Sequence, residues 1–409
     1  MKKKKKRVKK LYNKIFMRTP TDFTVVFIVL FLVAFGVIMI YSSTFRQETS
    51  KDFLSSSQMI ESENQIQIKE SPIKKMLGSD HTKQMLFAAL GFIVMYLVSK
   101  IRLDFLNRFA GLMYVFIIGM LILILFMGQD TKGAKRWFEL GPIKIQPSII
   151  ATFVLILSVS YLLTYLKYHL AKWRVLTLIF MLILLPAYLV FREDFSMSLV
   201  ILGVCVGMIF VAHKSSFKIV FMGLLLLAIL VFFAVLTNYR SSRIDSYLAG
   251  PWEDPENTGY QVIQSLYSIG SGGLTGNGLG MSIQKMGRFP EAHNDYIFAI
   301  ICEELGLFGG IAIILLFGVL LYRMLQIALT AKSMNHYLVV MGVMIHIGIQ
   351  TFFNIGVSTN LLPSTGIPLP FVSYGGSSLV MLLAEIGLVL NVARHNVIEE
   401  IVGGIHESK

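Results

Sequence analysis

Residues 109–127 read FAGLMYVFIIGMLILILFM, and this stretch decides the fold class because it contains no charged side chain. An α-helix crosses the hydrocarbon core of a membrane with roughly 20 apolar residues, so the segment is long enough to span. Of the 409 residues, 55% are apolar and only 15% are charged, and the mean hydropathy is +0.68. Soluble proteins carry about 25% charged residues. We therefore expect an all-α polytopic membrane protein, and exclude a soluble enzyme, a disordered scaffold and a disulfide-stapled secreted domain.

Ten segments are long and apolar enough to cross a membrane, and they predict ten transmembrane helices. The second is short, and the fifth contains Pro186, which we expect to kink the helix without ending it. Cys205 and Cys302 lie in separate apolar segments, so they predict neither a disulfide nor a metal site. The expected spans are residues 23–42, 84–99, 109–127, 147–166, 175–191, 196–213, 219–237, 295–322, 337–358 and 372–393.

Lysine and arginine predict the orientation, because they concentrate in the cytoplasmic loops of membrane proteins. They are dense in residues 1–22 and in the short links on the same side of the membrane, so we expect both termini in the cytoplasm. The ten-span domain then covers 23–393, and residues 394–409 form a second cytoplasmic tail. The first tail is interpreted as an orientation signal that contacts anionic lipid headgroups, not as a nucleic-acid-binding segment.

Four connections on the outer side are longer than a turn. Residues 43–82 are polar and lack hydrophobic periodicity, which predicts a loop with at most a surface helix. The other three are rich in glycine, proline, aromatic and charged residues, a composition typical of structured, functional loops. They are the second outer loop at 128–146, the large loop between the seventh and eighth spans at 238–294, and the last outer loop at 359–371.

Two of these loops carry backbone signals. Seven glycines from Gly270 to Gly287 indicate tight turns and a close approach of the backbone to something bulky. Pro363, Pro368 and Pro370 prevent an ordinary helix in the last outer loop. Non-helical backbone at membrane depth persists only where protein or water covers it, so this loop is expected to line a cavity.

The end of the large loop carries the candidate catalytic group. Pro290 is typical of the first turn of a helix, so Glu291, His293 and Asp295 are expected in that turn. Asp295 has two interpretations. It is a capping residue that complements the helix dipole, or it is a general base that is ionised at the membrane surface. His293 is either a partner of that carboxylate or a loop histidine bonded to backbone.

Cations and a tryptophan occur in the same outer loops. Trp137 is either an anchor among lipid headgroups or a residue that stacks on a sugar. Lys135 and Arg136 beside it form a basic pair suited to phosphate, which hints at an anionic partner. Further cations on the outer side are Arg243, Lys285 and Arg288.

Three glutamates, Glu303, Glu304 and Glu385, fall inside expected spans. A charge in lipid is costly, so these side chains are expected to face the interior and to have partners. His346, on another span, is a candidate partner. Both a proton relay and structural pairing are compatible with the sequence, and we favour structural pairing.

Five segments of this chain resemble the SEDS family (shape, elongation, division and sporulation), bacterial proteins that polymerise peptidoglycan glycan strands. The resemblance covers nearly all of the chain beyond the first loop, and within the family it is closer to the division branch than to the elongation branch. The matching segments, in the family's order, are GAKRWF with IQPS (133–148), DFSMSLV (194–200), PWEDPENTGYQVIQSLYSIGSGGLTGNGLGMSIQK (251–285), PEAHNDYIFAIICEELG (290–306) and LLPSTGIPLPFVSYGGSSL (361–379).

The resemblance implies ten spans in the bacterial plasma membrane, at the division septum, and polymerisation on the outer face. It implies lipid II as the substrate, with a class B penicillin-binding protein and other division proteins as partners. Asp295 matches the family's essential aspartate, and Trp137 matches its functional tryptophan. Candidate substrate-binding residues are Trp137, Arg136, Lys135, Lys285, Arg243, Arg288, His293, Glu291, Ser373 and Tyr374, supported by Asp194 and Glu304.

The chain departs from the family pattern at two places. Ile149 stands where the family commonly has a glutamate, and residues 192–197 read REDFSM where it commonly has QPDLGT. Asp194 is retained, and Glu193 is a candidate replacement for the missing carboxylate.

The residues fit an inverting displacement that needs one base and cations, but no second carboxylate. No cofactor is required, although a divalent cation, Mg²⁺ or Mn²⁺, is a candidate to share the charge of the diphosphate. A lipid II flippase is the main alternative, because it would use the same cations. A non-catalytic division scaffold is a further alternative, but a scaffold role does not explain the glycine-rich loop.

Overall fold

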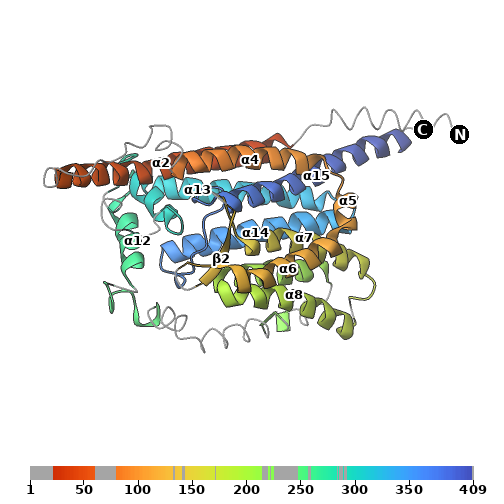
Figure 1. The fold of residues 1–409 in the computed structure, drawn as a ribbon. Helices are drawn as coiled ribbons and strands as arrows, with labels where there is room; N and C mark the ends of the chain where they lie inside the picture. The colour runs from red at the N-terminus through yellow and green to blue at the C-terminus, as the bar shows by residue number, and fades with distance from the viewer. Residues whose placement is uncertain are drawn as a thin grey trace.

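The long helices run side by side as a bundle (Figure 1). Within the described residues, nine helical segments are long and apolar enough to cross a membrane, which confirms the prediction of an all-α polytopic membrane protein. Most of the seventh expected span, 219–237, lies outside the described residues. This computed structural model describes residues 22–59, 80–131, 134–140, 143–170, 172–213, 220–221, 223–224, 247–256, 259–282, 284, 289 and 293–407.

Most of the described helices agree with the expected spans within a few residues. The helix α8 contains Pro186 and continues past it, as predicted. The helices are α2 (Phe23–Met59), α4 (Asp80–Lys100), α5 (Leu103–Arg108), α6 (Ala110–Met127), α7 (Pro147–Tyr165), α8 (Trp173–Glu193), α9 (Phe195–Ala212), α12 (Tyr260–Ser271), α13 (Ile297–Leu329), α14 (Met334–Ser358) and α15 (Gly376–Glu407).

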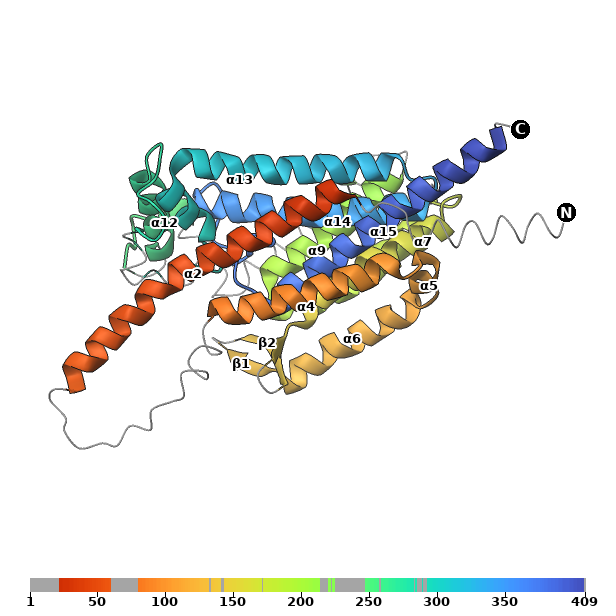
Figure 2. The ribbon, with the colours of Figure 1, turned by 90° about the horizontal axis from the view of Figure 1, so that it is seen from above.

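The first outer connection differs from the expected loop at 43–82. The helix α2 does not end at residue 42 but continues to Met59, and α4 already begins at Asp80. Residues 43–59 contain neither proline nor glycine, so no residue interrupts the helix where the apolar segment stops. The end of α2 projects beyond the bundle in Figure 2.

The glycine-rich segment packs against α13, at a break in that helix. Gly306 has φ 71° and ψ −167°, which is outside the helical range. A Cβ on Gly272 would lie 2.0 Å from the carbonyl oxygen of Cys302, and one on Gly276 would lie 2.2 Å from that of Glu304. Close approach was correctly predicted from these glycines, but the expected bulky group is the backbone of α13 itself. Only glycine lacks the Cβ that would prevent this contact.

Two elements that were not predicted lie at one end of the bundle. The second outer loop forms an antiparallel sheet in the order β1–β2–β3, and the large loop contains α12 (Figures 1 and 2). The pair Lys132-Gly133 separates β1 from β2, and the pair Gly141-Pro142 separates β2 from β3. Such dipeptides are typical of tight turns. The strands are β1 (Gln129–Thr131), β2 (Ala134–Leu140) and β3 (Ile143–Ile145).

The last outer loop is non-helical, as its prolines predicted, and its second half is largely buried in the bundle. A Cβ on Gly36 of α2 would lie 2.7 Å from the Cα of Val372, so α2 directly contacts this loop. Gln84 of α4 is fully buried; its amide donates to the carbonyl of Ser373 at 3.2 Å and accepts from the backbone N–H of Gly375 at 3.2 Å. Two transmembrane helices therefore fix the loop before α15 begins.

Candidate functional site

Residues 293–296 form a turn directly before α13, here called the aspartate turn. The helix begins at Ile297 and its N-cap residue is Tyr296, so Asp295 is not the capping residue. The expected helix start at Pro290 was therefore too early. Asp295 is instead partly exposed on a non-helical turn. By contrast, Asp194 does cap a helix, because its carboxylate accepts from the backbone N–H of Met197 at 3.1 Å at the start of α9.

Hydrogen bonds to its backbone carbonyls hold the first half of the aspartate turn against the last outer loop, which in the structure runs to residue 375, directly before α15 begins. The N–H of Tyr374 donates to the carbonyl of His293 at 3.0 Å, and the Ser373 hydroxyl donates to the carbonyl of Asn294 at 2.6 Å. The Ser373 hydroxyl also accepts from the N–H of Leu369 at 2.8 Å, and Ser373 is only 5% exposed. The geometry thus gives Ser373 a supporting position, and the substrate contact expected from sequence stays a prediction.

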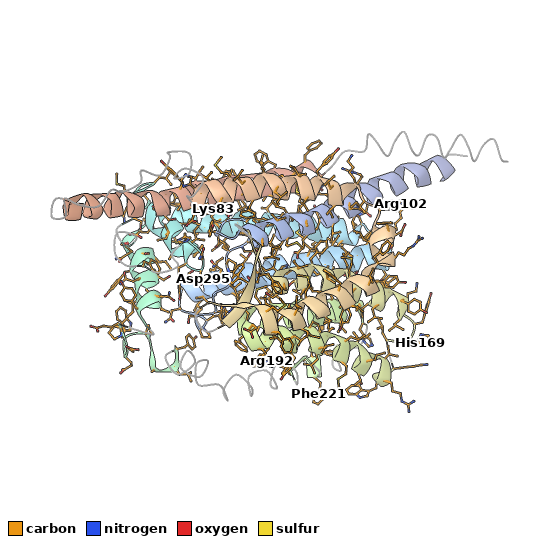
Figure 3. All side chains as sticks on the ribbon, in the orientation of Figure 1. Lys83, Arg102, His169, Arg192, Phe221 and Asp295 are labelled. Carbon is orange, nitrogen blue, oxygen red and sulfur yellow. The ribbon has the colours of Figure 1, made fainter. Side chains whose placement is uncertain are left out.

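The carboxylate of Asp295 lies beside Gly366 of the same loop. A Cβ on Gly366 would lie 3.3 Å from Oδ2 of Asp295, and Gly366 has a φ of +72° that favours glycine. In Figure 3, Asp295 lies toward the opposite end of the bundle from Arg102 and His169. These last two residues belong to links expected on the cytoplasmic side, so Asp295 is at the end expected to face outward.

Tyr374 connects the aspartate turn to the start of α4. Its ring meets that of His293 edge-on, with 5.8 Å between the ring centroids. Burial, together with the charge of Asp80 and a hydrogen bond to it, raises the pKa of Tyr374 to about 12. The phenol therefore remains protonated at neutral pH, and its hydroxyl is a hydrogen-bond donor.

A small, partly open pocket lies between the sheet and the ends of α6, α7 and α8. We call it the arginine pocket. The Arg136 Nε donates to the carbonyl of Glu193 at 2.8 Å, and its Nη1 lies 3.7 Å from Oδ2 of Asp194. Part of the Arg136 side chain stays exposed, at 40%. The lining residues are Leu121, Ile124, Arg136, Gln146, Pro147, Ser148, Leu189, Val190, Glu193 and Asp194.

Of the two departures from the family pattern, only the one at 192–197 reaches this pocket. Ile149 is buried in the apolar core, at 7% exposure. The carboxylate that faces Arg136 belongs to Asp194, and Glu193 contributes its backbone carbonyl and part of the lining. Trp137 follows Arg136 on β2 and is partly exposed. Its two interpretations, headgroup anchor and sugar stacking, both remain open.

One hydrogen bond joins α9, beside the arginine pocket, to the loop that flanks the aspartate turn. The hydroxyl of Ser196, in the first turn of α9, donates to the backbone carbonyl of Thr365. Asp194 caps that helix, and Gly366 follows Thr365 directly. A continuous path of contacts therefore leads from Asp194 to the carboxylate of Asp295.

The three buried glutamates all have partners, as expected. Glu303 accepts from the Ser282 hydroxyl at 2.6 Å and from the N–H of Gln284 at 3.1 Å. Both carboxylate oxygens of Glu304 lie 2.8 Å from the Ser42 hydroxyl of α2. His346 Nδ1 lies 2.7 Å from Oε2 of Glu385, which confirms the predicted partner. Glu303 and Glu304 thus tie the glycine-rich segment and α2 to α13.

Several predicted site residues cannot be placed. Lys135 lies on β2, but its side chain is outside the described part of the structure. Among the described residues, no group of three or more His, Cys, Asp or Glu could hold a metal ion. Both cysteines are buried and free. The predicted residues that lie wholly outside the described ranges are Arg243, Lys285, Arg288 and Glu291.

Sequence reasoning missed the polar residues that support the aspartate turn. Asn354 of α14 donates to the carbonyl of Asp295, and Gln84 and Ser196 hold the last outer loop. Their residue type was the available signal, because a polar side chain buried in a membrane span costs free energy and is typical of functional regions. Neutral polar residues such as these are common in membrane spans, so the sequence alone does not single them out.

The fold and these contacts define a class: a polytopic helical membrane protein with a carboxylate-bearing turn at one end of the bundle. Residues 23–398 match the family described as "Cell cycle protein", which comprises FtsW, RodA and SpoVE. The chain belongs to this family, which is the SEDS family, and it is FtsW-like.

Relatives and solved structures agree with this assignment. The chain is 36% identical to "Stage V sporulation protein E" of Bacillus subtilis, over 93% of this chain and 98% of the relative. It is 34% identical to "Probable peptidoglycan glycosyltransferase FtsW" of Geobacter metallireducens, over 91% and 94%.

Two solved structures cover 92% of this chain and 98% of their own. One is described as "Structural coordination of polymerization and crosslinking by a peptidoglycan synthase complex", with a TM-score of 0.73 and 27% identity. The other is the rod shape determining protein RodA of Thermus thermophilus, with a TM-score of 0.64 and 25% identity. The match extends over nearly the whole chain.

Proposed function

We propose that this protein polymerises lipid II into β-1,4 glycan strands on the outer face of the plasma membrane, with Asp295 as the general base. Its family and its relatives make it a peptidoglycan glycosyltransferase. One observation carries the role of Asp295. Asp295 is partly exposed on a turn whose backbone carbonyls accept hydrogen bonds from the Ser373 and Asn354 side chains, at the end of the bundle away from the basic links.

The proposed reaction is a single inverting displacement. The 4-hydroxyl of the acceptor sugar attacks the anomeric carbon of the α-linked donor, Asp295 takes its proton, and the diphosphate leaves with the bonding electron pair. The new glycosidic bond is β. A positioned base contributes about 10² to 10⁴ in rate, and the diphosphate needs no proton to depart.

Cations are proposed to stabilise the charge that develops on the departing diphosphate, which is commonly a large electrostatic contribution. Arg136 is the first candidate because part of its side chain remains exposed beside a pocket. Its partners Asp194 and Glu193 fix its orientation. The other candidates, in order, are Lys285, Arg243 and Arg288, and a divalent cation is proposed to share this task.

A class B penicillin-binding protein is the proposed partner, with the division septum as the proposed location. The similarity to a solved complex described as coordinating polymerisation and crosslinking supports a crosslinking partner. The FtsW names of the relatives support division as the setting. Copurification of the tagged chain with a transpeptidase from dividing cells tests both proposals.

The test of the proposed base is Asp295→Asn in purified protein supplied with lipid II. We expect no glycan polymer on a gel, with folding and lipid II binding intact, because an amide cannot accept the proton. The matched control is Asp104→Asn, which makes the same change at an exposed residue of α5, at the other end of the bundle. Wild-type amounts of polymer from Asp295→Asn would end the base assignment.

Lipid II transport is the second candidate, and one observation favours it. His346 lies midway along α14 and Glu385 lies midway along the membrane-spanning part of α15, where a translocation path needs polar groups. These two side chains bond to each other, and both are about 1% exposed, which supports a structural pair. Movement of labelled lipid II between the leaflets of proteoliposomes by Asp295→Asn and wild type alike would favour transport.

A further inference from the structure

Asn354 on α14 is a buried amide that bonds to two segments of the site. The residue is 0% exposed, and its Nδ2 donates to the carbonyl of Asp295 at 2.8 Å and to the carbonyl of Ile367 at 2.9 Å. An amide has two N–H donors, so one side chain satisfies both carbonyls. Asn354 thereby links the residue that bears the carboxylate to the loop that faces it.

The loop segment that Asn354 binds also lies beside the carboxylate of Asp295. Ile367 follows Gly366, whose Cβ position lies 3.3 Å from Oδ2 of Asp295. The two carbonyls held by Asn354 therefore set the distance between the carboxylate and the loop that flanks it. Ile367 itself is 2% exposed, so the loop cannot shift without moving the core.

A neutral polar side chain in a transmembrane helix costs free energy unless it is hydrogen-bonded. An apolar residue at position 354 would pack α14 against its neighbours without this free-energy cost. Three other polar groups hold the neighbouring carbonyls: the Ser373 hydroxyl, the N–H of Tyr374 and the Ser196 hydroxyl. Of these, none bonds to the carbonyl of Asp295 itself.

We infer that Asn354 is a positioning residue for the polymerase reaction: its amide holds the Asp295 carboxylate in line with the acceptor hydroxyl by fixing the backbone of Asp295 to the last outer loop. This inference rests on the proposed role of Asp295 as the base. Misplacement of a reacting group by about 1 Å costs roughly 10²-fold in rate.

The experiment compares Asn354→Ala and Asn354→Asp with Gln350→Ala in the purified full chain. Asn354→Asp keeps the shape but replaces the two amide N–H donors with at most one O–H donor of a protonated carboxyl. Gln350 is the matched control, because it is an amide one turn away on the same helix and is 2% exposed. We expect both Asn354 variants to lower kcat for lipid II about 10- to 100-fold. We expect KM to change less than about threefold, because the contacts to the substrate remain, and we expect Gln350→Ala to keep its wild-type kcat.

A merely structural role would reduce the amount of folded protein and leave kcat per folded molecule unchanged. That result overturns the inference, and so does failure of both Asn354 variants to fold while Gln350→Ala folds. Asp295→Asn is assayed alongside to separate the two proposals. If it is inactive and Asn354→Ala is fully active, only the positioning role fails. If it is active, the proposed base fails and the positioning role fails with it.

Discussion

The position of Asp295 is set by the backbone turn that carries it and by the glycine beside its carboxylate. The residue is not the N-cap of α13, and its carboxylate faces a glycine whose backbone conformation excludes most side chains. Asp295 lies on a turn whose carbonyls are bonded to a separate loop and to α14.

Gly366→Ala should lower the rate of glycan synthesis strongly and the free energy of unfolding only slightly. The added Cβ would lie 3.3 Å from Oδ2 of Asp295, so the carboxylate must shift, and the φ of +72° adds about 1 kcal/mol of strain. We expect at least a tenfold lower polymerisation rate, measured as glycan product from lipid II.

The control for this variant is Gly250→Ala. Gly250 has a φ of +94°, but no heavy atom lies within 4 Å of its Cβ position. It shares the backbone strain and lacks the contact with the carboxylate. Equal rates in the two variants would mean that crowding at Asp295 does not matter.

At the scale of elements, pairs of helices and loops are joined by buried polar contacts. The carboxylates of Glu303 and Glu304 bond to the glycine-rich segment and to α2, and the backbone break at Gly306 lets that segment pack against α13. His346 and Glu385 join α14 to α15 in the same way. These contacts fix the elements around the aspartate turn.

The His346–Glu385 pair should show strong coupling in a double-mutant cycle. Glu385→Leu leaves a buried imidazole without its partner, and His346→Leu leaves a buried carboxylate without its partner. Each is expected to cost about 3 to 5 kcal/mol of stability. The double variant should cost less than the sum, because neither polar group remains unpaired.

Unfolding of the detergent-solubilised protein by heat or denaturant measures this cycle. Gln350→Leu, a neutral buried side chain of the same helix, controls for the general effect of a substitution in α14. Additive losses in the double variant would show that the two side chains do not stabilise each other.

For the whole molecule, the two ends of the bundle differ in character. One end carries the sheet, α12 and Asp295, and the other carries α5, Arg102 and His169 (Figures 1 and 3). The proposed reaction requires the first end to face outward. Lys83 lies at this end, and its side chain is 43% exposed.

Cysteine labelling tests this orientation. A membrane-impermeant maleimide should label Lys83→Cys in intact spheroplasts and should label His169→Cys only after the membrane is opened. Cys205 and Cys302 are buried and should give little background. The reverse labelling pattern would place Asp295 on the cytoplasmic side and remove its access to the outer face.

Much of this architecture could be predicted from local sequence. A run such as 109–127 has no structure available in a membrane except a helix, because every backbone polar group must be bonded within the segment. The prolines at 363, 368 and 370 likewise excluded a helix from the last outer loop. The sheet and α12 were missed because glycine- and aromatic-rich loops carry weak periodicity over short lengths.

By itself, the sequence determined that this chain is a helical membrane protein, and it predicted a functional aspartate before a late span. Only the tertiary structure decided what surrounds that aspartate. Asn354 is 59 residues from Asp295, and Ser196 is 169 residues from Thr365, yet each pair is in hydrogen-bond contact. Periodicity and turn propensity act over neighbouring residues, whereas such contacts arise only when helices pack and bring distant polar groups to one place.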